Sequence, residues 1–505
     1  MAGPSSGDGR ARVVIVGGGF SGAATAVQLV RRSARPLAVT IVEPRATLGH
    51  GLAYAASDPD HRLNAPVERH AVDPDDAQAF ARWINAQGLR AEDPDAWLPD
   101  GRCFPRRRDF GRFVADTVAA HARTRGGSTI EHLRELARHA EPDGSAGGSA
   151  AWQLATAGGA RLAADLLILA TGNPPPRLPR FVDPALTGRP DVVGNPLAPG
   201  ALEGVARDAH VLVLGSGLTA LDAGSTLLQR GQRAPITVVS RHGRRPRPQP
   251  AADELPWLAT PLAPFDAPGG PLPPFVAALG RTPRLRALLR TLRERIARDA
   301  AAGLPWHAAF GSLRDAVWRF WPDLDAADKQ RFVRHLKVWY DVHRFLSPPQ
   351  NEALVRAAER GGRVRFVAAR VQGVMPAAEG PALQLVWQPR GSGAAGIERF
   401  DALVNCTGID GSGAAPADPL LRAMVGDGWL APGPAGLGFQ VDRALRAIGR
   451  DGVVHDSLRV VGPPSVGSLG DPIGAGFIAM QIRRAGPDML HALGAGPPVA
   501  REAPA

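Results

Sequence analysis

Residues 12–22 read RVVIVGGGFSG, a β-branched run that passes directly into a glycine-rich turn. Apolar residues at helical spacing follow as far as Arg32, and a second apolar run ends at Glu43. A strand, a tight turn, a helix and a second strand within about 30 residues predict the first unit of a doubly wound α/β sheet. The glycines of this turn stand in Gly-x-Gly-x-x-Gly spacing and are Gly17, Gly19 and Gly22.

This spacing lets a pyrophosphate approach the backbone closely and rest on the free N–H groups at the helix N-terminus. Glu43 stands where a carboxylate accepts hydrogen bonds from ribose hydroxyls. The unit therefore predicts a dinucleotide site that contains the three glycines and Glu43. The alternative interpretation is a glycine-rich turn beside an ordinary solvated glutamate.

A second copy of the same plan runs from His210 to Val239, with a turn at Gly215 and Gly217. Ala220 takes the place of the third glycine, and the acid at the strand end is replaced by Ser240 and Arg241. A carboxylate there would repel a 2′-phosphate that an arginine attracts, so the second unit predicts NADP rather than NAD. The alternative is a solvated loop in a chain that is rich in arginine.

Two dinucleotide sites in one chain suggest one tightly held redox cofactor and one that comes and goes, which is the pairing of FAD with NADPH. A buried strand ending in Ala170, Thr171 and Gly172 predicts the crossing between the two units, and Thr171 and Gly172 are assigned to the FAD site. A similar strand end at Asn405 to Gly408 predicts the return crossing.

The predicted fold class is α/β, with two Rossmann-like dinucleotide-binding domains and a mainly helical insertion. The FAD-binding domain is expected to be discontinuous, with the NADP domain inserted into it. The predicted boundaries are 11–176 and 401–485 for the FAD-binding domain, 205–400 for the NAD(P)-binding domain, about 244–350 for a Pro-rich and helical insertion within it, and 486–505 for a disordered tail.

Composition excludes several classes of function. Cys103 and Cys406 are the two cysteines of the 505 residues, so neither a disulfide framework nor a C-x-x-C dithiol is possible. The 13 histidines form no metal-binding pattern, and we expect no metal site. The net charge of +11 is spread along the chain, which argues against nucleic-acid binding. No apolar run is long enough to cross a membrane and no apolar leader follows Met1, so we expect a cytoplasmic protein.

The chain resembles the two-dinucleotide-binding flavoproteins of glutathione-reductase-like fold, and within them a bacterial group of FAD/NAD(P)-binding oxidoreductases. This group is similar to flavin-dependent N-hydroxylating and Baeyer–Villiger monooxygenases. Beyond the two glycine turns, the resemblance rests on Gly49-His50-Gly51-Leu52-Ala53-Tyr54, Leu63-Asn64-Ala65-Pro66, Pro105-Arg106-Arg107 with Phe110-Gly111, Gly217-Leu218-Thr219 with Asp222, Ser240-Arg241-His242-Gly243, and Val342-His343-Arg344.

The resemblance implies that Gly49, Gly51, Tyr54 and Asn64 lie near the isoalloxazine ring, with Tyr54 and Asn64 as the candidates beside it. It also implies a C-terminal flavin segment that contains Gly462 and Gly474. For Gly49, Gly51 and Asn64, an ordinary loop turn is the alternative, and for the C-terminal segment it is a plain helix start. Asp471 is interpreted as a helix cap rather than a catalytic acid. His343 and Arg344 belong to the pattern without a role that we can derive.

By the same resemblance we expect an NADPH-dependent FAD oxidoreductase, a class B-like monooxygenase that forms a flavin C4a-hydroperoxide. Its partners would be molecular oxygen and a small molecule, such as an amine or amino acid that is N-hydroxylated. Because the cofactor carries the chemistry, no side-chain triad is required and the catalytic residues stay unassigned. Two alternatives remain: a flavoprotein reductase or oxidase that inserts no oxygen, and a non-catalytic FAD-binding regulatory protein. The oligomeric state is open.

Overall fold

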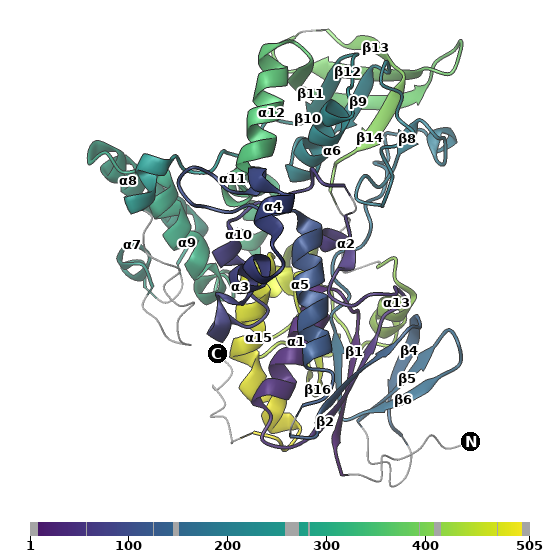
Figure 1. The fold of residues 1–505 in the computed structure, drawn as a ribbon, viewed down its shortest axis with the longest axis vertical. Helices are drawn as coiled ribbons and strands as arrows, with labels where there is room; N and C mark the ends of the chain where they lie inside the picture. Colours follow the sequence, from purple (N-terminus) through teal and green to yellow (C-terminus); the bar gives the residue numbers. More distant parts are fainter. Residues whose placement is uncertain are drawn as a thin grey trace.

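The computed structural model describes residues 9–56, 58–124, 126–144, 151–257, 272–280, 283–392, 394–408, 416–471 and 473–496. The chain forms two lobes, each built on its own sheet, and a group of helices beside them (Figure 1). We call the lobe with the six-stranded sheet the first lobe and the lobe with the seven-stranded sheet the second lobe. The predicted α/β fold class, with two Rossmann-like units and a mainly helical insertion, is confirmed.

The first sheet contains the N-terminal unit. Its strand order is β15-β16-β7-β1-β2-β3, and β1 pairs in parallel with both β2 and β7. Val14 and Ile15 are buried because α1 covers the sheet, which explains the uninterrupted apolar run in the sequence. The bounds are β1 Ala11–Val16, α1 Phe20–Arg32, β2 Leu37–Val42, β3 Thr129–Leu133, β7 Leu166–Leu169, β15 Arg446–Ile448 and β16 Val454–Val460.

Smaller elements complete the first lobe. A three-stranded antiparallel sheet of order β4-β5-β6 is formed by Ala137–Pro142, Trp152–Thr156 and Arg161–Ala164. The other helices of this lobe are α2 Gly51–Tyr54, α3 Ala79–Ala86, α4 Leu89–Glu92, α5 Arg107–Ala120, α13 Pro419–Gly426, α14 Val466–Leu469 and α15 Ala475–Ala492.

The second sheet has the order β13-β12-β11-β10-β9-β14-β8, and its core strands β9 and β10 are parallel. Helices α6 and α12 pack against each other in this lobe. The bounds are β8 Val192–Val193, β9 Val211–Leu214, α6 Leu218–Gln229, β10 Ile236–Ser240, α12 Pro349–Arg360, β11 Val364–Pro376, β12 Leu383–Pro389, β13 Gly396–Phe400 and β14 Ala402–Asn405.

The second lobe extends beyond the predicted limits of 205 and 400. Strand β8 joins the sheet upstream of residue 205, and β14 pairs in parallel with β9 downstream of residue 400. The domain boundary predicted at residue 401 therefore falls later, because β14 completes the second sheet before the chain returns. The return follows the end of β14 at Asn405, where the sequence predicts the crossing. The entry and the exit meet at Asn405, whose Nδ2 donates to the carbonyl oxygen of Arg177 at 3.0 Å.

The predicted disordered tail is also corrected. Helix α15 continues to Ala492, and Met489, Leu490 and Leu493 are buried in the core of the first lobe. Pro487 stands inside this helix without ending it. Residues 497–505 lie outside the described part of the chain.

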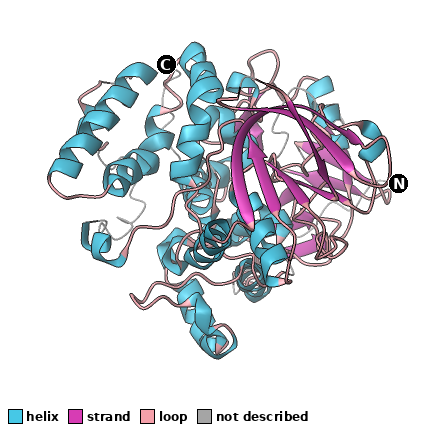
Figure 2. Cartoon of the chain, turned by 90° about the horizontal axis from the view of Figure 1, so that it is seen from above, coloured by secondary structure: helices cyan, strands magenta, loops and turns pink. Residues whose placement is uncertain are grey.

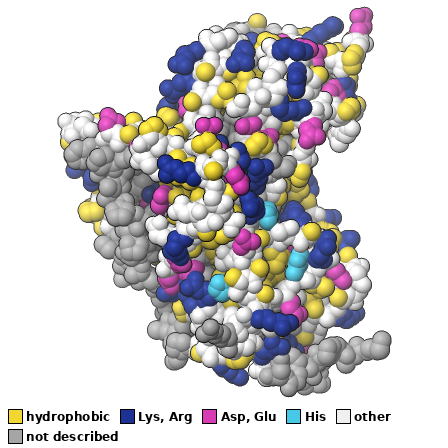
Figure 3. Space-filling view, in the orientation of Figure 1, with side chains coloured by type: hydrophobic (Ala, Val, Ile, Leu, Met, Phe, Trp, Pro, Cys, Tyr) yellow, Lys and Arg dark blue, Asp and Glu magenta, His cyan; other side chains and the backbone are white. Residues whose placement is uncertain are grey.

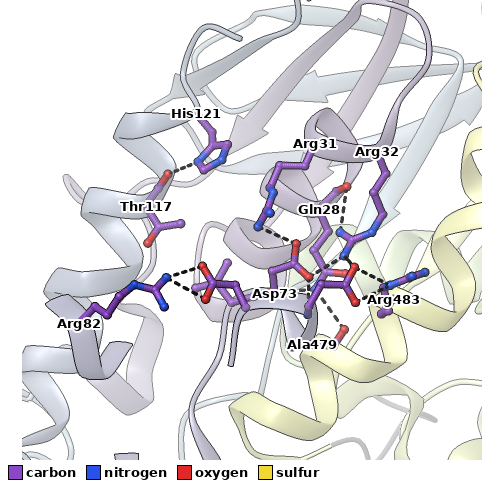
Figure 4. A network of polar contacts seen from close by, with 12 residues as sticks. Gln28, Arg31, Arg32, Asp73, Arg82, Thr117, His121, Ala479 and Arg483 are labelled. Atoms are coloured by element: carbon purple, nitrogen blue, oxygen red, sulfur yellow. Dashed lines mark hydrogen bonds and ion pairs between the residues drawn. The ribbon is translucent and has the colours of Figure 1, made fainter. Parts of the chain in front are cut away.

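Helix α15 is held to α1 by polar contacts that Figure 4 shows. The buried amide of Gln28 donates to the carbonyl oxygens of Val72 and Ala479, at 2.8 and 3.0 Å. Asp73 lies between Arg31 and Arg32 and forms an ion pair with each. The Gln28 contact fixes the C-terminal helix beside α1, and the Asp73 ion pairs fix the loop at residues 72–73 to the same helix.

The helical insertion lies to the side of both sheets, and Figure 2 shows the helices gathered away from the strands. Its elements are α7 Pro274–Ala277, α8 Leu285–Ala301, α9 Trp306–Phe320, α10 Ala326–Arg331, the π-helix η6 Phe332–Leu336 and α11 Lys337–Arg344. It has its own apolar core around Leu288, Phe310 and Trp321. The Pro-rich segment that precedes it includes residues 258–271, which lie outside the described residues.

Basic side chains are spread over the face seen in Figure 3, with acidic side chains among them. Within the described residues, no helix is both long and apolar enough to span a bilayer.

Candidate functional site

A cleft of about 1660 Å³ lies between the two lobes and the helical insertion. Both glycine turns open into it, because the carboxyl ends of β1 and β9 face it from opposite sides. The cleft also receives both crossings, through Thr171 and Thr407. The two predicted dinucleotide units therefore share one cavity.

The first turn leaves no room for side chains. Gly17 has φ +101°, and a Cβ there would overlap the carbonyl oxygen of Ala170. A Cβ at Gly22 would overlap the carbonyl oxygen of Gly17, so α1 packs directly on the turn. Gly19 lies against Gly51. A turn of this shape lets a phosphate approach the backbone N–H groups at the start of a helix.

Glu43 lies where the sequence predicts it, at the end of β2 and on the wall of the cleft. The residue is 5% exposed, and its carboxylate accepts from the N–H groups of Gly18 at 2.9 Å and Arg45 at 3.0 Å. Glu43 thus stabilises the glycine turn through these hydrogen bonds, and the hydroxyls of a bound ribose would donate to the same carboxylate oxygens.

The crossing from the first lobe supplies an unsatisfied polar atom. The hydroxyl of Thr171 is buried, lines the cleft and has no hydrogen-bond partner among the described residues. A Cβ at the neighbouring Gly172 would meet no atom within 4 Å. An orphaned hydroxyl beside open space fits a polar ligand that lies over the first turn. This observation and the glycine cradle match the requirements of a dinucleotide.

The second turn repeats the geometry. Gly215 has φ +94°, and a Cβ there would overlap the carbonyl oxygen of Cys406. Gly217 faces open space, and Ala220 is buried where the third glycine would stand.

The end of β10 carries a basic loop. Arg241, His242 and Arg244 line the cleft, and burial together with Arg390, Arg241 and Arg244 lowers the pKa of His242. The Arg244 guanidinium lies 3.4 Å from the ring centroid of Trp339. The Ser240 hydroxyl is engaged with Ser216 and with the N–H of Gly243, so it orders the loop. Arg241 and Arg244 are the cationic side chains of this loop that line the cleft.

The residues assigned to the flavin ring lie in two different surroundings. Gly49 donates its N–H to the carbonyl oxygen of Gly18 at 2.7 Å, and Gly51 touches Gly19, so both support the first turn from behind. Tyr54 packs edge-on against Phe110, and burial raises its pKa to about 12. The carbonyl oxygen of Asn64 accepts from Gln249. None of these four lines the cleft, and their proximity to a flavin stays a prediction.

The C-terminal segment differs from expectation at Asp471. Helix α15 begins after Gly474, which has φ +94° and no side-chain cap. Asp471 instead accepts from the Tyr340 hydroxyl at 2.8 Å and from the Arg344 guanidinium. The interpretation of Asp471 as a cap is therefore wrong. Gly462 lies against Ser21 of α1, outside the cleft lining.

This contact gives Arg344 the structural position that the sequence left open. Its guanidinium donates to Asp471 and to the carbonyl oxygen of Ile473 at 2.7 Å, and the side chain is 8% exposed. Burial raises the pKa of Tyr340 well above its usual range, so its hydroxyl stays a donor. The insertion is thereby fixed to the loop that precedes α15. His343 instead contacts Trp306 and the carbonyl oxygen of Trp339.

Sequence reasoning missed the face of α11 that lines the cleft. Lys337 and Asp341 form an ion pair at i and i+4, and burial raises the pKa of Asp341. Val338, Val342 and Phe345 add an apolar wall. Only the tertiary packing of the insertion brings this face to the two turns.

Other reactive groups are few. Cys103 and Cys406 are both free and buried, and burial raises the pKa of the Cys103 thiol to about 12. In the part of the chain that the structure describes, no group of three or more His, Cys, Asp or Glu side chains could hold a metal ion.

Residues 14–174 match the family model described as FAD-NAD(P)-binding, which confirms the predicted cofactor class for the first unit. No curated protein sequence matches the chain. Three solved structures resemble it over almost their whole length. They are an ornithine N-hydroxylase from Kutzneria sp. 744 (16% identity, TM-score 0.62, 96% of this chain and 99% of that chain), an L-lysine 6-monooxygenase from Pseudomonas syringae (17%, 0.62, 95% and 99%) and an ornithine hydroxylase from Pseudomonas aeruginosa (16%, 0.60, 96% and 100%). At these identities the likeness shows the fold.

Proposed function

We propose that the protein is an NADPH-dependent FAD monooxygenase that oxygenates the nitrogen of a small amine or amino acid. The observation that supports it most is the single cleft that receives both glycine turns and the orphaned Thr171 hydroxyl. The fold neighbours are named for hydroxylation of ornithine and monooxygenation of lysine, which gives the proposal its reaction class.

The residues of the cleft divide the work of binding. The N–H groups of the first turn and the Thr171 hydroxyl would hold FAD, with Glu43 at the ribose. The second turn with Arg241 and Arg244 would hold NADPH and its 2′-phosphate. When bound, the flavin supplies hydride acceptance and oxygen activation. The net reaction consumes the amine, O₂, NADPH and a proton, and it yields the hydroxylamine, NADP⁺ and water.

The chain's own contribution is alignment and exclusion of water. Val338, Val342 and Phe345 present an apolar wall to the cleft, and the Asp471 contact holds that wall in place through Arg344. A dry cavity strengthens each charge interaction inside it and limits side reactions of reactive intermediates with water. We assign no proton-transferring side chain.

The visible spectrum of the FAD-loaded protein tests the proposal, recorded anaerobically with NADPH and then in air. We expect NADPH to bleach the flavin and ¹⁸O from ¹⁸O₂ to enter a hydroxylamine when amines such as ornithine, lysine or cadaverine are supplied. Bleaching followed by stoichiometric peroxide with every amine would favour the reductase or oxidase alternative. A flavin that neither NADPH nor NADH reduces would favour the non-catalytic one.

A further inference from the structure

A second cavity, of about 1060 Å³, lies between the lobes and shares no lining residue with the cleft. The first lobe contributes residues 56, 58–62, 93–95, 97 and 106, and the second lobe contributes residues 196–198 and 200–203 with parts of α6 and α12. We call it the acidic cavity. Its size is that of a ligand site rather than of a packing defect.

Four polar side chains on this wall have buried atoms without a hydrogen-bond partner in the described chain. The unpaired atoms are both ring nitrogens of His61, the hydroxyls of Ser225 and Thr226, and Oε1 of Gln350. His61, Ser225 and Thr226 are 4%, 1% and 3% exposed. Buried polar groups are almost always paired in folded proteins, so this concentration indicates that something polar completes them.

The wall is also unbalanced in charge. It carries the carboxylates of Asp58, Asp60, Asp93, Asp95 and Glu203, against the guanidinium groups of Arg62, Arg106 and Arg230. Asp93 uses two of the arginines, Arg62 at 2.8 Å and Arg106 at 3.5 Å. Arg230 donates to the backbone carbonyl oxygens of Leu202 and Glu203.

Four carboxylates are left over. Within the described residues, those of Asp58, Asp60, Asp95 and Glu203 have no ion-pair partner. Burial, and then the nearby Asp58, raises the pKa of Asp60 to about 6, although Arg62 and Arg106 act in the opposite direction. This negative pocket stands out in a chain of net charge +11.

From these observations we propose that the acidic cavity binds a small aliphatic amine as its ammonium form. The carboxylates of Asp58 and Asp60 neutralise the charge, while His61 and the hydroxyls of Ser225 and Thr226 bind the remaining polar groups. A metal ion is a poorer fit because no three of these acids and histidines converge on one point. The ligand touches both lobes, and the acidic cavity is separate from the dinucleotide cleft. The proposal does not rest on the function proposed for that cleft.

Calorimetric titration of the full-length protein with putrescine, in an amine-free buffer near neutral pH, tests the proposal. We expect one saturable binding event, and no heat from butanediol, which has the same length without charge. Asp60→Asn should weaken binding about tenfold because a charge-assisted contact is lost. Thr226→Val, which conserves side-chain shape, should weaken it several-fold.

The matched control is Asp208→Asn, which removes a carboxylate from the exposed surface of the second lobe. We expect its affinity for putrescine to equal that of the unmodified protein. The proposal is overturned if putrescine gives no saturable heat, if butanediol binds equally well, or if the Asp60 and Asp208 variants weaken binding alike. Should Asp60→Asn fail to fold, Thr226→Val and Glu203→Gln decide the question.

Discussion

Gly22 is the residue at which the first turn has least space, since a Cβ there would overlap the carbonyl oxygen of Gly17. We expect Gly22→Ala to lower the free energy of unfolding by about 2 kcal/mol and to reduce the FAD content of the purified protein. The control is Gly224→Ala in α6, where a Cβ meets no atom within 4 Å. This change should stabilise the helix by about 0.5 to 1 kcal/mol. Denaturant unfolding measures both, and equal effects would contradict the packing argument.

Arg241 carries the prediction of cofactor preference. If its guanidinium binds the 2′-phosphate, Arg241→Ala should raise the KM for NADPH about tenfold and leave the KM for NADH within about twofold. Steady-state reduction kinetics with both nucleotides measure this. Arg233→Ala, which removes an exposed arginine paired with Asp208, is the control and should change neither value. A proportional loss with both nucleotides would show that Arg241 acts on a part that they share.

His70 predicts a pH dependence of stability. It is 5% exposed, its Nδ1 donates to the carbonyl oxygen of Pro66, and burial lowers its pKa to about 4. In the unfolded chain the imidazole binds a proton below about 6.5, while the folded chain resists it until about 4. Stability is therefore complete above about pH 6.5 and falls as the pH drops toward 4.

We expect His70→Asn to remove up to about 3 kcal/mol of this acid destabilisation, because 1.36 kcal/mol corresponds to each unit of the shift. The measurement is urea unfolding at several pH values for the variant and the unmodified protein. His139→Asn is the control at an exposed site. Parallel pH profiles for the His70 variant and the unmodified protein would contradict the assignment.

At this scale, the parts of the site that could be predicted are those written in consecutive residues. Both glycine turns and Glu43 follow from spacing alone, and the structure places them in one cleft. The contact between Arg344 and Asp471 could not be predicted, because it joins residues 127 positions apart through the packing of the insertion. The sequence also cannot show that the Ser240 hydroxyl accepts a hydrogen bond from Gly243 of its own loop.

Helix α15 belongs to the first lobe through Gln28, whose amide joins two carbonyl oxygens of separate elements. Gln28→Met keeps the volume and removes the side-chain donor from the carbonyl oxygens of Val72 and Ala479, so we expect a loss of about 1 to 3 kcal/mol in unfolding free energy. Thermal and denaturant unfolding measure it. Gln330→Met, on the exposed side of α10, should stay within about 0.5 kcal/mol. Equal stabilities for the two variants would count against the role of this amide.

Strands and helices with strong local patterns were predicted well, as β1, α1, β9 and α6 show. The element boundaries were predicted less well, because they depend on pairing across the molecule. Strand β14 looks like the start of the return segment, yet its partner is β9. The sequence at the end of α15 is polar and contains a proline, but Met489 and Leu490 are buried in the core of the first lobe. Burial against distant residues overrides local composition in both cases.

For the whole molecule, the relation of the lobes depends on an ion pair on the side of α6. Arg107 of α5 donates to Asp222 of α6 at 2.6 Å, and Asn351 also contacts this carboxylate, which is 1% exposed. Asp222→Ala leaves the partly buried guanidinium of Arg107 without this partner and should lower the free energy of unfolding by about 3 kcal/mol. The double variant with Arg107→Ala should be little less stable than Asp222→Ala alone, because the guanidinium that lacked a partner is also removed.

A double-mutant cycle by denaturant unfolding measures this coupling. The exposed pair of Arg233 and Asp208 provides the comparison, with an expected coupling below about 1 kcal/mol. If the effects of the Asp222 and Arg107 variants simply add, the ion pair does not hold the lobes in their present relation.

The amide of Asn405 joins the end of β14, where the chain leaves the second lobe, to the loop at Arg177, where the chain enters it, and this has a mechanical consequence. Two adjacent connecting segments form a hinge, so the easiest movement of the second lobe is rotation about the line through Arg177 and Asn405. Such rotation would widen the cleft on one side while it compresses the acidic cavity on the other, because α6 borders both. A ligand bound in the cleft or in the acidic cavity would then change how far the other space opens.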